Sequence, residues 1–431
     1  MMFKTPFLIC VFILIFIFSP ANGDTGSERG TKIKIDFTER FRFVSWDNPV
    51  TLDSSSEEGS AFTRNRTSLG LLWKPFSGLD IYFKATNEFR YYFKPEGRDF
   101  NINEIFVDNF YLKLKNICDL PLTITAGRQN LFFGEGFIIV DGGPLDGSRS
   151  IWFDAVRGDI SLGNSGRLTA FYLSAPKEDD LFPVLNDRGQ LLNENSSTGA
   201  GFYYSGKWKK KDMDLYLVKK SYGENVIEKR NYTVAGARMV LPMSDDMAVV
   251  GEAAYQWGNS GDIPVSAAGG YFYFRYIPIS GISVLKGLTF GSLYLSGDDP
   301  FTDKIEGWDP VFSRWPKWSE SFIYTLVMEG GAAYWSNLSS FFFTLDLNPV
   351  KNGVLSTALY FLTAPERGCS CLDYRGNGIA RGFLFTGRFD YRFSSVLSGH
   401  VVFEHFDPGN FYFEKAESYN WFRIELMYKI K

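Results

Sequence analysis

Positively charged side chains recur two residues apart in several segments of the chain. Arg40 and Arg42 form one such pair, and Arg64 and Arg66 form another. Residues i and i+2 of an extended strand point to the same face, so each pair would project two guanidinium groups from one side of a sheet. A planar guanidinium group binds a carboxylate through two parallel hydrogen bonds. The pattern therefore predicts a surface that attracts carboxylated solutes.

The same alternation assigns further basic side chains to this inward face. The candidates are Arg40, Arg42, Arg64, Arg66, Lys84, Arg90, Arg157, Arg238, Arg275, Arg388, Arg392 and Arg423. Acidic side chains share the face, namely Asp36, Glu88, Asp159, Asp390, Glu404 and Glu425. Two interpretations follow. The opposite charges pair across strands in a solvated lumen, or clustered arginines form an electropositive constriction that concentrates anions. A uronic-acid polymer is one solute that fits the second interpretation.

Catalytic motifs are scarce in this sequence. Its two histidines, His400 and His405, are five residues apart, so they would face opposite sides of a regular strand. No Gly-x-Ser-x-Gly segment is present. Because a nucleophile needs an adjacent base, we expect no enzymatic activity. A membrane-embedded lipase or acyltransferase is the alternative from a different functional class, and no cofactor is expected.

Three cysteines follow the N-terminal apolar segment: Cys118, Cys369 and Cys371. An odd number cannot form a fully paired disulfide framework. The closely spaced pair is compatible with a strained disulfide, a redox pair or half of a metal site. With no histidine nearby, we favour a loop detail without an assigned role.

The elements that must carry the charged residues are long strands. Residues 31–43 alternate strictly, with Ile33 and Ile35 on one face and Lys34 and Asp36 on the other, which is typical of a strand. This length suits a transmembrane strand, which needs about 9–11 residues. Eighteen strands are predicted, at 31–43, 63–74, 79–94, 104–115, 122–133, 151–162, 167–175, 198–209, 212–221, 231–241, 246–257, 264–277, 287–297, 336–348, 354–363, 381–392, 397–406 and 418–430.

Short and long connections alternate along these strands. Residues 75–78 and 393–396 are short, whereas 44–62, 176–197 and 298–335 are long. Short turns at one end and long loops at the other are the layout of an outer-membrane barrel. We therefore predict an all-β fold, a transmembrane antiparallel β-barrel of about eighteen strands in contact with outer-membrane lipid. A large soluble all-β protein, such as a propeller or β-helix, is the alternative.

The N-terminal segment predicts secretion. Lys4 precedes an apolar run at 6–18, and small residues lead to a cleavage site before Asp24. This is the pattern of a signal peptide at 1–23, with 24–431 as the barrel; an uncleaved anchor is the alternative. The net charge of −4 gives no indication of a nucleic-acid partner. The expected location is the bacterial outer membrane.

Two segments resemble a known family. Residues 127–136 read GRQNLFFGEG, and residues 149–157 read RSIWFDAVR. Together with the C-terminal run 382–431, they resemble the alginate export (AlgE-like) family of outer-membrane barrels. The resemblance implies an eighteen-stranded, monomeric barrel that passes an anionic polysaccharide through an arginine-lined pore. It adds Arg128 and Arg149 to the candidates and includes Arg157.

Departures from that family leave other functions open. The connection 393–396 is short where the alginate exporter carries a long periplasmic turn, so a general or substrate-selective porin for small solutes is the alternative. A surface adhesin is a further one. Strict alternation with Ile124 and Ala126 would also aim Arg128 outward, unless a bulge forms near Gly127. Trp308, Trp315 and Trp318 in loop 298–335 fit loop packing or a membrane interface better than sugar stacking.

Overall fold

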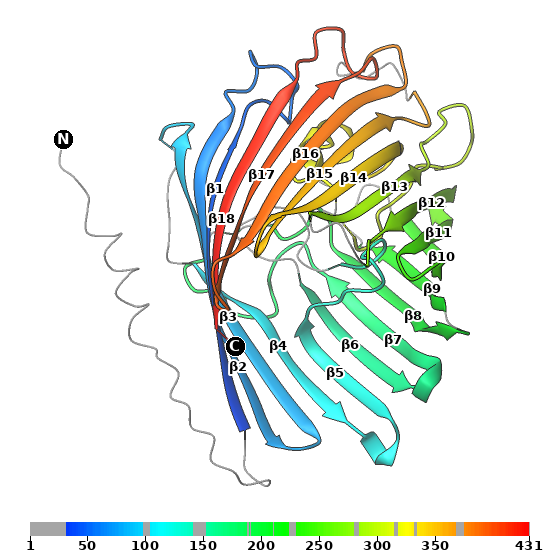
Figure 1. Cartoon of the computed structure of the whole chain (residues 1–431). Coiled ribbons are helices and arrows are strands. Elements are labelled where there is room, and N and C mark those ends of the chain that lie inside the picture. Colours follow the sequence, from blue (N-terminus) through cyan, green and yellow to red (C-terminus); the bar gives the residue numbers. More distant parts are fainter. Residues whose placement is uncertain are drawn as a thin grey trace, which may run out of the picture.

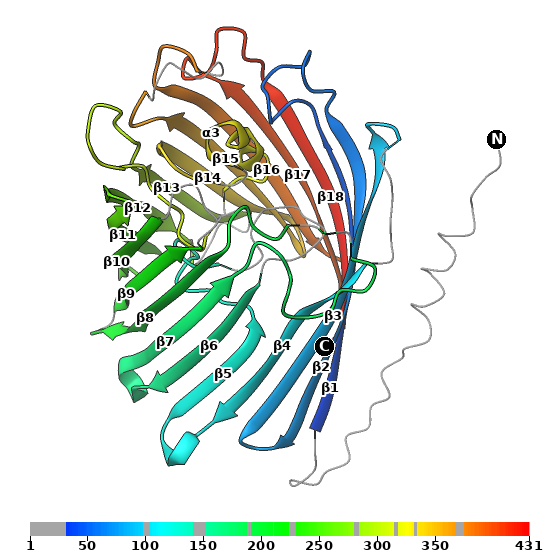
Figure 2. The same cartoon turned by 180° about the vertical axis from the view of Figure 1, so that it is seen from behind.

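Eighteen antiparallel strands close into one barrel (Figures 1 and 2). The computed structural model describes residues 32–97, 104–140, 152–187, 189, 191–209, 211–223, 230–279, 284–313, 318–331, 334–367 and 375–430. The strands are β1 (Lys32–Trp46), β2 (Ser60–Phe76), β3 (Leu79–Lys94), β4 (Ile105–Lys115), β5 (Leu122–Gln129), β6 (Phe153–Ser161), β7 (Gly166–Ala175), β8 (Ser197–Trp208), β9 (Lys211–Tyr222), β10 (Arg230–Pro242), β11 (Met247–Ser260), β12 (Ile263–Tyr276), β13 (Leu285–Leu295), β14 (Leu338–Val350), β15 (Gly353–Thr363), β16 (Ala380–Arg392), β17 (Leu397–Pro408) and β18 (Tyr419–Ile430).

The first and last strands close the ring. β1 pairs with β18 through ten residues, from Phe37 opposite Ile430 to Trp46 opposite Trp421. Each remaining strand pairs with its neighbours in the sequence, so the barrel is a meander without crossovers. The predicted fold class and the eighteen strands are therefore confirmed.

The predicted strand 122–133 is too long, because β5 ends at Gln129. Beyond that point the chain leaves the wall. The ring of Phe133 stacks on Tyr203 with centroids 4.6 Å apart and also contacts Phe171. The alternating apolar residues after Gln129 thus serve a loop that packs inside the barrel, which a local pattern cannot distinguish from a strand.

The outer surface carries a belt of large apolar side chains. Phe341, Phe361 and Phe272 have 67%, 59% and 58% of their surface exposed. Aromatic residues this exposed need an apolar solvent, and the strands are long enough to cross a bilayer. The fold and this belt place the protein in the bacterial outer membrane.

Two loops fill part of the barrel interior. The β5–β6 loop, described at residues 130–140 and 152, and the β13–β14 loop, described at 296–313, 318–331 and 334–337, meet at a short parallel bridge between Ile139 and Phe312. The second loop also holds α2 (Phe322–Thr325) and α3 (Val327–Gly330), the latter seen inside the ring of strands in Figure 2. Trp308 is buried against Phe137, with ring centroids 5.2 Å apart, in keeping with the loop-packing interpretation.

Some predictions fall outside the described residues. They are the signal peptide at 1–23, Arg149, Trp315, Cys369 and Cys371. Within the described residues, none of the helices is long and apolar enough to span a membrane.

Candidate functional site

The lumenal face of β1–β3 gathers arginines around one buried carboxylate. Glu88 on β3 accepts hydrogen bonds from Arg64 Nε at 2.7 Å, Arg66 Nη1 at 2.8 Å and Arg40 Nη2 at 3.2 Å. The register explains this convergence, because Arg40 lies opposite Arg66, and Arg66 lies opposite Glu88. The i, i+2 pattern of the sequence thus becomes a compact charged cluster.

A second carboxylate completes this cluster. Asp108 on β4 pairs with Arg66 Nη2 at 3.0 Å and with Lys84 Nζ at 2.6 Å. Four cations, Arg40, Arg64, Arg66 and Lys84, therefore share the two carboxylates of Glu88 and Asp108. The surplus of positive charge faces the lumen, where a low-dielectric wall strengthens its field.

The charged surface continues onto the last strands. Arg42 pairs with Glu425 of β18. Arg388 Nε donates to Asp390 at 2.6 Å, and its side chain is 41% exposed. Arg388 and Arg392 line a cavity of about 630 Å³ near the short-turn end. We call the lumenal cations of β16, β18 and β1–β3 the basic strip; they are Arg40, Arg42, Arg64, Arg66, Lys84, Arg90, Arg388, Arg392 and Arg423.

Arg423 connects the basic strip to the β13–β14 loop. Its Nε donates to His400 Nε2 at 3.0 Å, and its Nη2 donates to Glu320 Oε1 of the loop at 2.9 Å. His400 is buried at this contact, whereas His405 is partly exposed beside Asp407. The two histidines lie apart, as their spacing predicts.

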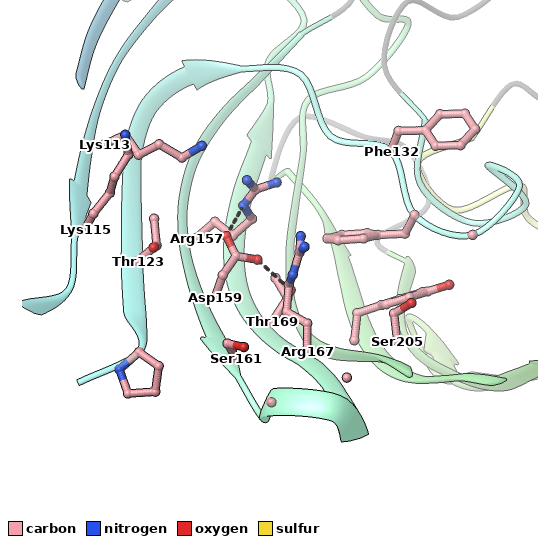
Figure 3. A pocket seen from close by; sticks show the side chains of 16 residues that line it. Lys113, Lys115, Thr123, Phe132, Arg157, Asp159, Ser161, Arg167, Thr169 and Ser205 are labelled. Carbon is pink, nitrogen blue, oxygen red and sulfur yellow. Dashed lines mark hydrogen bonds and ion pairs between the residues drawn. The ribbon is translucent and has the colours of Figure 1, made fainter. Parts of the chain in front are cut away.

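A second basic surface lines the adjacent part of the lumen, on β4–β8 (Figure 3). A cavity of about 720 Å³ is bordered there by Lys113, Lys115, Arg157 and Arg167, with Asp159 among them. Lys113 lies opposite Thr125, which lies opposite Arg157. The backbones of Lys113 and Arg157 are therefore about 10 Å apart, at about 5 Å per strand.

Not all cations of this cavity are neutralised. Arg157 pairs with Asp159 at 2.9 Å, and Lys115 pairs with Asp80 at 2.5 Å. Lys113 and Arg167 form no ion pair with any residue that the structure describes. Neither was among the predicted candidates, although Lys113 alternates with the exposed Leu112 and Leu114 in the same way as the arginines of β1.

The remaining predicted cations have varied surroundings. Arg238 pairs with Glu135 of the β5–β6 loop at 2.9 Å and with Asp214 at 3.2 Å, so it anchors that loop. Arg90 lies over the Phe62 ring, 5.0 Å from its centroid. Arg275 is partly exposed near the end of β12. The structure thus brings most candidates onto two lumenal surfaces and assigns Arg238 a loop contact.

Arg128 lies on the other side of the wall. It is opposite Asp154 in a regular register. Phe153 and Ala155, the neighbours of Asp154, point into the interior cluster. Asp154 and Arg128 therefore belong to the outward set, as strict alternation indicated, and the register shows no bulge that would turn Arg128 inward.

Arg128 is covered by Trp152, which precedes β6, and by the β7–β8 loop, described at residues 176–187, 189 and 191–196. Its guanidinium group donates to Asp179 at 2.7 Å and to Asp154 at 2.9 Å. The rings of Trp152 and Phe182 lie on it at 4.2 and 4.6 Å. With 0% of its surface exposed, Arg128 holds the loop against the wall and lines no open part of the lumen.

The β13–β14 loop is anchored through Asp309. Lys220 Nζ donates to this carboxylate at 3.0 Å, and the hydroxyls of Tyr232 and Tyr222 donate at 2.6 and 2.5 Å. Burial by itself would raise the pKa of Asp309, but Lys220 and the two hydroxyls outweigh it and lower the pKa to about 2. The loop is thus held in the lumen by an ionised carboxylate.

Comparison with known proteins bears on the fold. No family model matches the sequence, and no curated protein gives a significant match. Solved structures from Pseudomonas aeruginosa do match over almost their whole length. OpdQ is 13% identical, with 93% of this chain and 97% of that chain covered and a TM-score of 0.56. OccK2 (OpdF) in complex with glucuronate is 11% identical, with 92% and 98% covered and a TM-score of 0.58.

The fold is that of an outer-membrane porin. The outer membrane protein OpdK is a third similar structure, 10% identical, with 92% of this chain and 99% of that chain covered and a TM-score of 0.58. These neighbours are channels and not alginate exporters. The family resemblance found in the sequence is therefore supported at the level of an outer-membrane β-barrel, and its narrower part, alginate export, is not.

Proposed function

We propose that this porin is a selective channel for small carboxylated solutes. The observation that carries the proposal is the surplus of lumenal cations. Four cations share Glu88 and Asp108 on one wall, and Lys113 and Arg167 add two cations without an ion pair among the described residues. Cations distributed along a channel act as weak serial sites, which speed an anion without trapping it.

The packing of the loops favours small solutes over a polymer. The β5–β6 and β13–β14 loops meet inside the barrel through buried side chains, including Phe137, Trp308 and Phe322. Two cavities of about 720 and 630 Å³ lie toward the short-turn end, and Phe132 and Phe133 of the β5–β6 loop border the first. Binding sites for small molecules are typically about 300–1,000 Å³. The glucuronate bound in the similar OccK2 structure is a solute of this class.

Export of an alginate-like polysaccharide is the second candidate function. It rests on the matching segments at 127–136 and 149–157 and on the cationic lumen. Against it, Arg128 from the first segment is wholly buried at the wall. A general porin would differ from both of these channels because its transport rate would not depend on the charge of the solute.

Planar bilayers and proteoliposomes test the proposal. We expect anion preference in a KCl gradient, and faster liposome swelling with glucuronate than with glucose. A polyuronate of many residues should block the current and should not cross. Equal rates for glucuronate and glucose would favour a general porin. Passage of the polyuronate would favour export, and cation preference would overturn every anion-channel interpretation.

A further inference from the structure

A glutamate side chain lies among the apolar side chains of the lipid-facing surface. Glu39 alternates with Arg40, which faces the lumen, and it shares its face with Phe41 and Ile35, which are 39% and 59% exposed. Thr67 donates a hydrogen bond to its side chain and is the one hydrogen-bond partner of that carboxylate among the residues that the structure describes. Such a group is unexpected on an apolar belt.

The position along β1 places Glu39 within the apolar belt. Glu39 is the central residue of this 15-residue strand. On the outer face of β2, the exposed Leu69, Leu71 and Trp73 lie between Thr67 and the short turn, and Phe41 follows Glu39 toward the other end of β1. On the side of β18 the strand end is nearer, because Tyr428, which lies opposite Glu39, is two residues from Ile430. A glutamate side chain is shorter than a lysine side chain and extends less far along the wall.

Lys219 is a charged residue of the outer face whose surroundings differ from those of Glu39. It is an exposed cation on the outer face of β9, close to the strand end at Tyr222. A long lysine side chain can extend to the membrane interface. Lys219 therefore needs no partner, whereas Glu39 does.

Further polar groups surround Glu39. Tyr428 and Thr67 lie directly opposite it on β18 and β2, and Asn65 is the next outward residue along β2. We call Glu39, Asn65, Thr67 and Tyr428 the polar patch. Apolar side chains border it on the same strands, among them Leu69 and Leu71, which are 55% and 41% exposed. The amide of Asn65 and the hydroxyl of Tyr428 make no side-chain hydrogen bond within the described residues.

We propose that the polar patch binds a second copy of this chain, so that two barrels associate side by side in the membrane. Lipid chains offer no hydrogen-bond partner to a carboxyl group, ionised or neutral. A second copy offers the amide of Asn65 and the hydroxyl of Tyr428, and it brings an equivalent carboxylate to the donors of the first. Acceptor and donors occur in the same patch, so a two-fold contact satisfies both copies reciprocally. Interhelical polar contacts stabilise association in membranes by the same principle.

Single-molecule photobleaching of the purified full-length protein in supported bilayers tests the proposal. With one fluorophore per chain, the wild type should bleach mainly in two steps. Glu39→Leu should bleach in one step, because it removes the acceptor and leaves the belt apolar. Asn65→Leu should lower the two-step fraction, and Glu39→Gln, which keeps hydrogen-bonding capacity, should retain most of it.

Ser292→Leu is the matched control. Ser292 faces outward on β13, between the exposed Phe290 and Tyr294, so the same polar-to-leucine change is made in another sector of the wall. Ser292→Leu should still bleach mainly in two steps. Unchanged single-channel conductance verifies that each variant is folded. One-step bleaching of the wild type would overturn the proposal, and so would two-step bleaching of Glu39→Leu.

Discussion

At the scale of single residues, exposure separates the basic side chains into two groups. Arg64, Arg128 and Arg423 are buried and paired with carboxylates. Lys113 and Arg167 border an open cavity without an ion pair in the described part of the chain. Removing a cation from the first group should affect folding, whereas removing one from the second should affect the current.

The double variant Lys113→Gln/Arg167→Gln should weaken anion preference. Two uncompensated charges leave the lumen, so the reversal potential in a KCl gradient should move several millivolts toward zero. Stability should change by less than about 0.5 kcal/mol per site, as is usual for exposed positions. Lys219→Gln removes one positive charge from the outer face of β9 and should leave the reversal potential unchanged. An equal shift in both variants would contradict a local effect of the cavity.

Arg128→Ala should destabilise the β7–β8 loop and should leave the anion selectivity of the channel unchanged. Deleting one partner of a buried ion pair typically costs about 3–5 kcal/mol, because the carboxylates of Asp154 and Asp179 lose their cation. Limited proteolysis should therefore cut at 176–187 in the variant and spare the wild type. Arg128→Lys should protect the loop partially. A large loss of anion preference with an intact loop would instead assign Arg128 to the pore.

At the scale of elements, the β13–β14 loop determines how much of the lumen stays open. It is fastened at Asp309 on one side and at Arg423 on the other. Glu404 of β17 adds hydrogen bonds from Ser319 at 2.6 Å and from the backbone of Ser321 at 3.0 Å. These polar anchors make the loop position dependent on ionisation.

The Asp309 anchor should weaken in acid. The pKa of Asp309 is lowered from its ordinary 3.8 to about 2 by folding. Its contribution to stability is therefore fully present above about pH 4 and is lost as the pH falls toward 2. Single-channel current noise should rise over that window. Asp309→Asn should be noisy already at pH 6 and should respond less to acid. Low current noise in Asp309→Asn at pH 6 would show that the loop is held by other contacts.

Shortening the loop should widen the channel. Replacing residues 299–335 with a short Gly-Ser linker removes α2, α3 and the buried aromatic contacts. Conductance should increase several-fold, while anion preference persists because the basic strip belongs to the wall. Unchanged conductance would mean that the constriction lies elsewhere. Loss of anion preference would instead show that the selectivity of the channel depends on residues of the loop.

At the scale of the whole molecule, the lumen acts through its summed field. The chain has a net charge of −4, yet cations prevail on the two lumenal surfaces described above. The barrel therefore separates charge between its lumen and its other surfaces, which composition alone would not show.

Anion preference should fall with ionic strength. The Debye length shrinks from about 10 Å at 0.1 M salt to about 3 Å at 1 M, so fixed charges several ångströms from the solute path are screened. The ratio of anion to cation permeability, measured in KCl gradients of low and high mean concentration, should approach unity at the higher one. A ratio independent of salt would indicate direct contact between solute and arginine rather than a long-range field.

The sequence by itself determined the barrel. Strand positions and the two faces follow from a period of two, which is a local property of consecutive residues such as those of β1 and β18. The same pattern correctly set Arg40 and Arg66 on the lumenal face and aimed Arg128 outward. The same alternation places Lys113 inward, between the outward-facing Leu112 and Leu114.

The tertiary structure decided what the charged residues do. Glu88 accepts hydrogen bonds from three arginines, and Asp309 accepts one from Lys220. Arg128 is buried against Asp179. Each contact joins segments separated by about 20 to 90 positions. The path of the two inner loops likewise depends on Phe133 and Trp308 finding partners across the barrel. Long-range packing, which no local pattern encodes, therefore determines which cations remain free to bind a solute.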